Sequence, residues 1–146
     1  MARLFTLQEA EELLPRVERW LRDAIESKKN LSEADSGLNA LLVKINMVGG
    51  LRVDLGRVAE LKSGKERSLE TLKQALGEIE TNGVLVKDLD IGLIDFPTLL
   101  DEQEVYLCWK LGESHIGWWH HTSEGYAGRK AIDRDFLERH QGGRPH

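Results

Sequence analysis

Side chains that can bind a metal or carry out acid–base chemistry gather in one short stretch of this 146-residue chain. The fourteen residues from Cys108 to His121 hold the only cysteine, three of the four tryptophans and three of the five histidines. Acidic residues flank the stretch, with Asp95 before it and Glu113 inside it. We therefore expect any specific site to lie in the C-terminal third of the chain.

Metal binding is the first chemistry that these residue types suggest. Glu113 and His120, with Asp95 or Cys108 as further candidates, are ligands that zinc or iron accepts. However, the chain has no HExxH, CxxC or HxH spacing. His120 and His121 are neighbours, so in a strand they point to opposite faces and cannot both bind one ion. The sequence therefore does not lead us to predict a cofactor. Binding of a divalent metal, zinc or iron, by Glu113 and His120 is a hypothesis.

Nucleophilic and acid–base catalysis have weaker support in the sequence. Cys108 lies inside an apolar segment with no evident base beside it, which is typical of an inert packed thiol. The chain has no GxSxG, P-loop or dinucleotide-binding pattern. Asp88, Asp90 and Asp95 could act as acids or bases, but an acidic pair just before Gly92 is also typical of a solvated turn. We favour the turn for Asp88 and Asp90.

Five residues make up the candidate ligand site: Asp95, Glu113, Trp119, His120 and Arg129. Alternation in a strand sends Trp118 and Trp119 to opposite faces, so one indole enters the core and the other remains on the second face. The alternative is that both indoles cover the rim of a small core. Arg129 has two possible roles. It could form an ion pair with a nearby carboxylate and so tie the C-terminal loop to the sheet, or it could bind an anionic ligand.

The overall composition narrows the classes of partner. Net charge is −5, and residues 83–146 carry seven basic and eleven acidic side chains, which argues against binding a phosphate backbone. No window approaches the roughly 18 apolar residues of a membrane span. One cysteine cannot form an internal disulfide, and the N-terminus lacks the apolar run of a signal peptide. We expect a cytoplasmic protein without nucleic-acid or membrane partners.

The first 82 residues read as amphipathic helix. Thr6 and Glu9 form a capping-box pattern, and Pro15 predicts a kink or a short first helix that feeds a longer one. A second helix is expected from Asp35 or Ser36 to the pair at 49–50, and a third series spans 51–81, as one helix or two. One apolar stripe marks the first helix, at Leu7, Ala10, Leu14, Val17, Leu21, Ala24 and Leu31.

After Gly83 the pattern changes to short apolar runs separated by turn residues. Strands are predicted at 84–86, 92–94, 105–109 and 116–119, with the last two paired as an antiparallel hairpin and Phe96-Pro97 ending a strand. A last helical turn is expected around Phe136, and residues 141–146 should be frayed. The fold class is therefore α+β: an N-terminal long α-helical hairpin or bundle packed on a small C-terminal antiparallel β-sheet. It forms a single domain over 1–146, with a helical part at 1–82, a sheet at 83–129 and a charged tail at 130–146.

The chain also resembles the prokaryotic domain-of-unknown-function family 2203. The resemblance rests on three stretches: FTLxEA at 5–10, VKDLDxGLIDFP at 86–97, and the motifs from YLCWKLGE at 106–113 to GYAGR at 125–129. It implies a small, stand-alone cytoplasmic protein and assigns no catalytic residue. One histidine after the tryptophans is usual in that family, so the resemblance implies that His121 is incidental.

Two functions from different classes remain. The first, which we favour because no recognised catalytic spacing is present, is a non-enzymatic binding or oligomerising protein. It would self-associate through its apolar helix faces as a homo-oligomer. The second is a small-molecule or metal site at the five candidate residues, with hydrolysis as one use.

Overall fold

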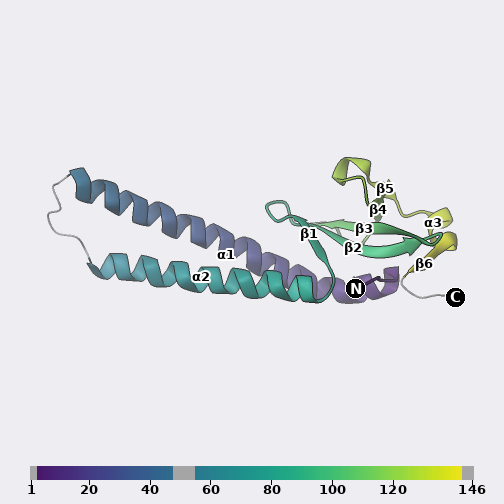
Figure 1. The fold of residues 1–146 in the computed structure, drawn as a ribbon, viewed down its shortest axis with the longest axis horizontal. Helices are drawn as coiled ribbons and strands as arrows, with labels where there is room; N and C mark the ends of the chain where they lie inside the picture. Colours follow the sequence, from purple (N-terminus) through teal and green to yellow (C-terminus); the bar gives the residue numbers. More distant parts are fainter. Residues whose placement is uncertain (1–2, 48–54, 143–146) are drawn as a thin grey trace. The chain divides into compact units, whose positions relative to one another are not determined.

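The computed structural model describes residues 3–47 and 55–142. The chain forms two compact units, one from residues 1–22 with 76–146 and the other from residues 23–75. Two long helices, α1 (Leu7–Met47) and α2 (Leu55–Thr81), each contribute to both units. The α+β class is confirmed, with a helical hairpin followed by an antiparallel sheet (Figure 1). The assignment of one domain stays a prediction.

The first unit contains an antiparallel sheet whose strands lie in the order β1-β2-β3-β4-β5, with β6 paired to β2. Its long central strands β2 and β3 are joined by a tight turn in which Asp101 and Glu102 both have positive φ. The strands are β1 (Leu85–Asp88), β2 (Leu93–Leu100), β3 (Gln103–Lys110), β4 (Trp118–His121), β5 (Lys130–Ala131) and β6 (His140–Gly142). A 3₁₀ turn, η1 (Tyr126–Gly128), precedes β5, and a short helix, α3 (Arg134–Arg139), precedes β6.

One face of this sheet forms the core against the first turns of α1 and the last turns of α2. Alternate residues of β2 and β3 supply Ile94, Phe96, Leu107 and Trp109, all fully buried. The apolar stripe of α1 that the sequence predicts provides the other side, at Ala10, Leu14, Val17 and Leu21. Phe5 packs edge-on to Phe96 with ring centroids 5.3 Å apart. The opposite face of the sheet is thereby left for the polar residues discussed below.

The start of α1 is held by the predicted capping box. The Glu9 carboxylate accepts from the Thr6 N–H at 2.9 Å, and the Thr6 hydroxyl accepts from the Glu9 N–H at 3.0 Å. A further contact, which the sequence does not predict, also holds this helix start: the Leu7 N–H donates to Nε2 of His140 at 3.0 Å. A residue near the C-terminus therefore satisfies one of the free N–H groups of the first helix.

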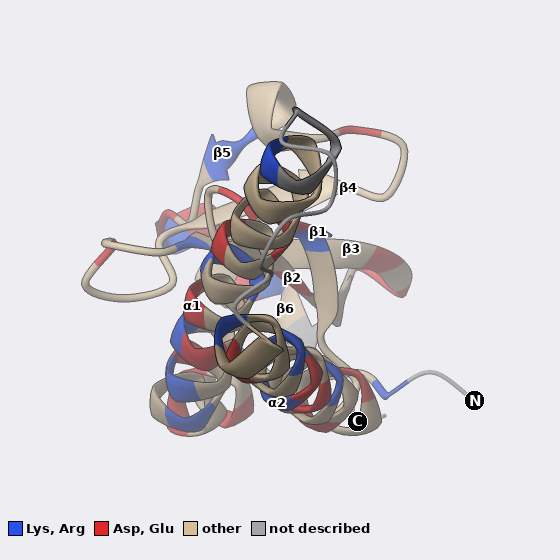
Figure 2. Cartoon of the chain, turned by 90° about the vertical axis from the view of Figure 1, so that its left-hand side faces the viewer, with Lys and Arg blue, Asp and Glu red and all other residues tan. Residues whose placement is uncertain are grey.

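In the second unit α1 and α2 run antiparallel, which confirms the helical hairpin (Figure 1). Asp35 and Lys65 form an ion pair across the two helices at 2.6 Å. Gly37 lies so close to Leu61 that an added Cβ would sit 3.3 Å from the leucine methyl groups. Positions of basic and acidic residues are interspersed along both helices (Figure 2).

Several predicted helix boundaries are wrong. No break occurs at Pro15, and no new helix starts at Asp35 or Ser36, because α1 is continuous from Leu7 to Met47. Asp35 binds Lys65 instead of capping a helix, and burial of the flanking apolar residues outweighs the hydrogen bond that Pro15 cannot make. The predicted stop at 49–50 and the start of the third series at 51 lie outside the described residues.

The third apolar series is one helix from Leu55, and its predicted end at Asn82-Gly83 is confirmed. Gly83, with φ of 87°, donates to the Glu80 carbonyl, and Val84 donates to the Ile79 carbonyl. This pair of bonds is the Schellman arrangement, which requires the left-handed backbone that glycine adopts readily. In the described part of the chain, no helix is long and apolar enough to cross a membrane.

Two strand predictions also need correction. β2 does not end at Phe96-Pro97 but continues to Leu100, and the Pro97 carbonyl accepts from the Phe5 N–H at 2.7 Å. Because the N and C=O of one strand residue point to the same side, Pro97 has its missing N–H on the side away from β3. The charged tail predicted at 130–146 holds β5, the expected helical turn as α3, and β6, with Phe136 of α3 buried as expected. β6 extends to Gly142 and so includes two of the residues predicted to be frayed.

Candidate functional site

Three side chains of neighbouring strands meet on the face of the sheet opposite the helices. Asp95 lies in β2, Cys108 pairs with it in β3, and His120 lies in β4 opposite Tyr106. Residues two apart in a strand share a face, so His120 is the diagonal neighbour of Cys108 and reaches across β3 toward Asp95. All three side chains are almost completely buried.

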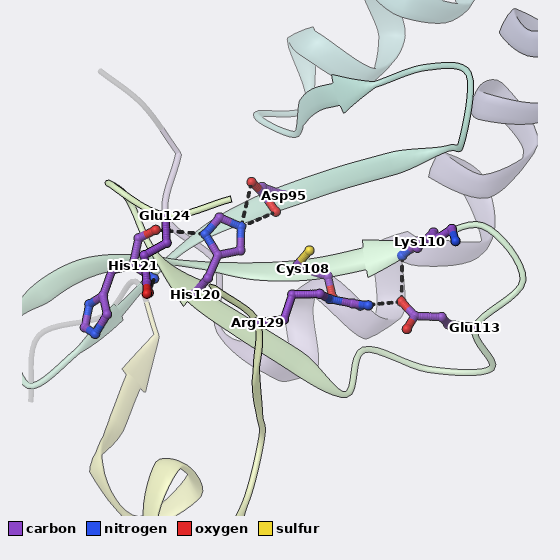
Figure 3. Close-up of polar contacts among 8 residues, drawn as sticks. All are labelled: Asp95, Cys108, Lys110, Glu113, His120, His121, Glu124 and Arg129. Carbon is purple, nitrogen blue, oxygen red and sulfur yellow. Dashed lines mark hydrogen bonds and ion pairs between the residues drawn. The ribbon is translucent and has the colours of Figure 1, made fainter. Parts of the chain in front are cut away.

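The three residues form a compact group of possible metal ligands. Nε2 of His120 lies 3.0 Å and 3.1 Å from the two carboxylate oxygens of Asp95. With Sγ of Cys108 added, one ligand atom from each residue lies within 4.8 Å of the others. Figure 3 shows the carboxylate, the imidazole and the thiol facing the same space from three strands. No other such group is found in the part of the chain that the structure describes.

The backbone fixes the orientation of the His120 ring. Its Nδ1 lies 2.8 Å from the carbonyl oxygen of His121, which can only accept, so Nδ1 carries the proton and donates. Tyr106 packs edge-on to the ring with centroids 5.5 Å apart. Nε2 is thereby directed toward Asp95, an arrangement that metal-binding histidines commonly show.

Burial also sets the acid–base properties of the other two groups. Burial raises the pKa of the Asp95 carboxyl, and the neighbouring His120 opposes this effect. Burial, together with the negative charge of Asp95, raises the pKa of the Cys108 thiol to about 12. Cys108 is therefore not an activated nucleophile, as its position in the strand predicts.

Arg129 and Glu113 form a second polar pair beside Cys108. A guanidinium N–H of Arg129 donates to the Glu113 carboxylate at 2.6 Å, and the same nitrogen lies 3.4 Å from the carbonyl of Cys108. That carboxylate also accepts from the Lys110 N–H at 2.7 Å, which closes the turn after β3. The predicted ion pair that ties the C-terminal loop to the sheet is present.

The structure thus divides the five predicted site residues. It brings Asp95 and His120 into contact, and it places Arg129 and Glu113 together next to Cys108. It does not bring Trp119 to them, because Trp119 lies on the core face against Phe136 with centroids 5.4 Å apart. The two indoles do face opposite ways, but the partly exposed Trp118 is the one that covers the Arg129 guanidinium, at 5.0 Å.

The metal hypothesis also changes its residues. Glu113 is held by Arg129 and the turn, and it is not part of the group that contains His120. Cys108 is the third member of that group. Alternation along the strand predicts the face of the sheet on which Cys108 lies. Its alignment with Asp95 and His120 depends on the strand register, which alternation does not determine. Asp88 accepts from the Asp90 N–H in the exposed turn before Gly92, as expected.

Comparison with known proteins identifies a family but no activity. The family model described as uncharacterized conserved protein (DUF2203) matches residues 3–132, which confirms the resemblance found in the sequence motifs. No curated protein and no solved structure matches the chain.

Proposed function

We propose that this chain, which belongs to the family of uncharacterized conserved proteins DUF2203, is a metal-binding protein that holds one divalent ion between Asp95, Cys108 and His120. The observation that carries the proposal is the convergence of a carboxylate, a thiol and an oriented imidazole in a buried space within 4.8 Å. Buried charged or ionisable groups of this kind are usually paired or bind metals.

The donor set favours zinc. Zinc accepts oxygen, nitrogen and sulfur ligands together, at about 2.0–2.3 Å, in a tetrahedral arrangement. A shift of a few tenths of an ångström would convert the 3.0 Å separation of His120 Nε2 and Asp95 Oδ1 into the spacing of two zinc ligands. Iron accepts the same residue types and is the alternative ion.

Three protein ligands leave a fourth position for water or another donor. Asp95 and Cys108 as anions with a neutral His120 would balance the charge of a divalent ion. Because the three ligands are almost completely buried, we infer a role for the ion in holding β2, β3 and β4 together. Hydrolysis at the fourth position is the alternative use.

Metal content and chelation test this proposal. Protein purified without chelator should carry about one zinc or iron per chain, and removal of the ion should lower the melting temperature. His120→Ala and Cys108→Ser should abolish binding. His121→Ala is the matched control, because that ring packs on Trp119 on the other face and should leave binding intact. A metal-free protein that takes up no added zinc and melts unchanged with chelator would refute the proposal.

A second candidate function is self-association of the helical hairpin with a second copy of the chain. Among the described residues of the 23–75 unit, the buried ones are small: Ala24, Ser27, Ala34 and Ala75. Large apolar side chains stay exposed there, with Leu42 at 57%, Val43 at 56% and Leu55 at 74%. Two such hairpins could complete a four-helix core, and every copy carries the same surface.

The molar mass from light scattering tests self-association independently of metal binding. A dimer or larger species is expected, and Leu42→Glu with Val43→Glu should convert it to a folded monomer. Ala59→Glu, at an exposed position of α2, is the control for the effect of added negative charge. A monomer at high concentration would contradict self-association and would leave the metal proposal standing.

A further inference from the structure

The Arg129 side chain is buried but incompletely bonded. Its relative exposure is 9%, and its Nε finds no hydrogen-bond partner among the described residues. A buried donor without a partner is unfavourable, and more so when it belongs to a charged group. Such a donor calls for an acceptor that the described residues, as they stand in the structure, do not supply.

The guanidinium has little freedom to turn toward solvent. One edge is held by Glu113 and the carbonyl of Cys108. The rings of Trp118 and Tyr126 lie 5.0 Å and 4.9 Å from its central carbon. These contacts hold the Arg129 guanidinium in place beside Cys108. An acceptor for the Nε–H must therefore lie where that group already points.

The Cys108 thiol is the group that can do so. It lies within hydrogen-bonding reach of the Arg129 guanidinium, and a metal ion binds cysteine as the thiolate. Figure 3 shows the sulfur between the Asp95–His120 pair and the Arg129 side chain. A sulfur that is a thiol is a poor acceptor, whereas a metal-bound thiolate carries a negative charge and accepts N–H groups well.

We infer that Arg129 is a positioning residue of the metal site, whose Nε–H donates to the Cys108 thiolate once the ion is bound. This inference rests on the proposed function. Glu113 holds the guanidinium in place and balances its charge, so the donor is ready before the ion arrives. The Arg129–Glu113 pair is thus a polar support for the sulfur ligand as well as a tie for the C-terminal loop.

Cobalt(II) is a suitable probe, because its bond to a thiolate gives a charge-transfer absorption band in the near ultraviolet. A hydrogen bond to sulfur lowers the energy of the sulfur electrons and raises the energy of this band. Arg129→Gln should shift the band to longer wavelength and weaken Co²⁺ binding by about tenfold to hundredfold. Arg129→Lys, which keeps the charge but lacks the Nε–H, should shift the band in the same direction with a smaller loss of affinity.

Lys130→Gln is the matched control. It removes the same charge from the next residue, whose ammonium binds Glu124 at 2.7 Å and contacts neither Cys108 nor Glu113. Its band and affinity should equal those of the unchanged protein. If Arg129→Gln unfolds by circular dichroism, Arg129→Lys and Glu113→Gln carry the test.

The outcomes separate this inference from the metal proposal. A thiolate band that stays at the same wavelength in the Arg129 variants overturns the inference and leaves the metal site intact. Absence of cobalt binding in the unchanged protein overturns both. A band that shifts equally in Lys130→Gln would reveal a general effect of charge and would also overturn the inference.

Discussion

The contact between His140 and the start of α1 gives a prediction for stability. Nε2 of His140 accepts from the Leu7 N–H at 3.0 Å, and Nδ1 lies 3.1 Å from the Leu99 carbonyl, to which it donates. The ring also stacks on Phe136, with centroids 5.1 Å apart. His140→Ala removes all three contacts and leaves a backbone donor and acceptor unpaired.

The expected loss follows from these contacts. A helix-capping bond contributes about 0.5–2 kcal/mol, a further hydrogen bond about 0.5–1.5 kcal/mol, and ring stacking about 0.5–1.5 kcal/mol. His140→Ala should therefore lower the free energy of unfolding by roughly 2–4 kcal/mol at pH 8 and the melting temperature by roughly 5–15 °C. All four tryptophans lie in the unit formed by residues 1–22 and 76–146, so their fluorescence reports its unfolding.

The loss should also depend on pH. Burial lowers the pKa of His140 below its ordinary value, while the bond to the Leu99 carbonyl acts in the opposite sense. Because the folded-state pKa is below the unfolded-state one, the contribution of His140 is fully present above about pH 6.5 and is lost as the pH falls through the folded-state value. Protonated Nε2 can no longer accept from Leu7.

Urea denaturation at pH 8 and pH 5 measures this dependence. The difference between the unchanged protein and His140→Ala should be large at pH 8 and smaller at pH 5. His115→Ala, which alters an exposed histidine, should change neither value. An equal difference at the two pH values, or no loss at pH 8, would refute the reasoning.

Three further changes can be tested by thermal melting and thiol labelling. Gly92→Ala should destabilise strongly, because its φ is 68° and an added Cβ would lie 2.5 Å from Cβ of Leu111. Gly77→Ala should stabilise by about 0.5–1 kcal/mol, since this helical glycine has open space around it; a lower melting temperature would contradict this. Cys108 should react with iodoacetamide only as the protein unfolds, because the thiol is buried and its pKa is about 12. Fast labelling of the folded protein would contradict it.

Local sequence patterns correctly predicted the end of a helix where residues close to that end make the capping bonds. The box of Thr6 and Glu9 and the stop at Gly83 involve bonds within a few residues, so the sequence contains the whole interaction. Asp35 and Ser36 also match a helix start, yet α1 passes through them. Asp35 has a partner in Lys65, about thirty residues away, and such a contact is not visible in a local pattern.

The site was predicted in part for the same reason. Alternation in the strand correctly separated Trp118 from Trp119 and His120 from His121. Choosing between the two indoles needed the register, which pairs Leu107 with Trp119 and so sends that indole into the core. The meeting of Asp95, Cys108 and His120 depends on two strand pairings at once, and the spacing along the chain carries no trace of it.

The most direct test of the metal site is a crystal structure of the protein grown with zinc, with diffraction data collected on both sides of the zinc absorption edge. We expect one anomalous peak between Asp95, Cys108 and His120, with bonds of about 2.0–2.3 Å to their oxygen, sulfur and nitrogen atoms. An ordered site without a peak, in which Nε2 of His120 still bonds directly to the Asp95 carboxylate, would contradict the proposed function.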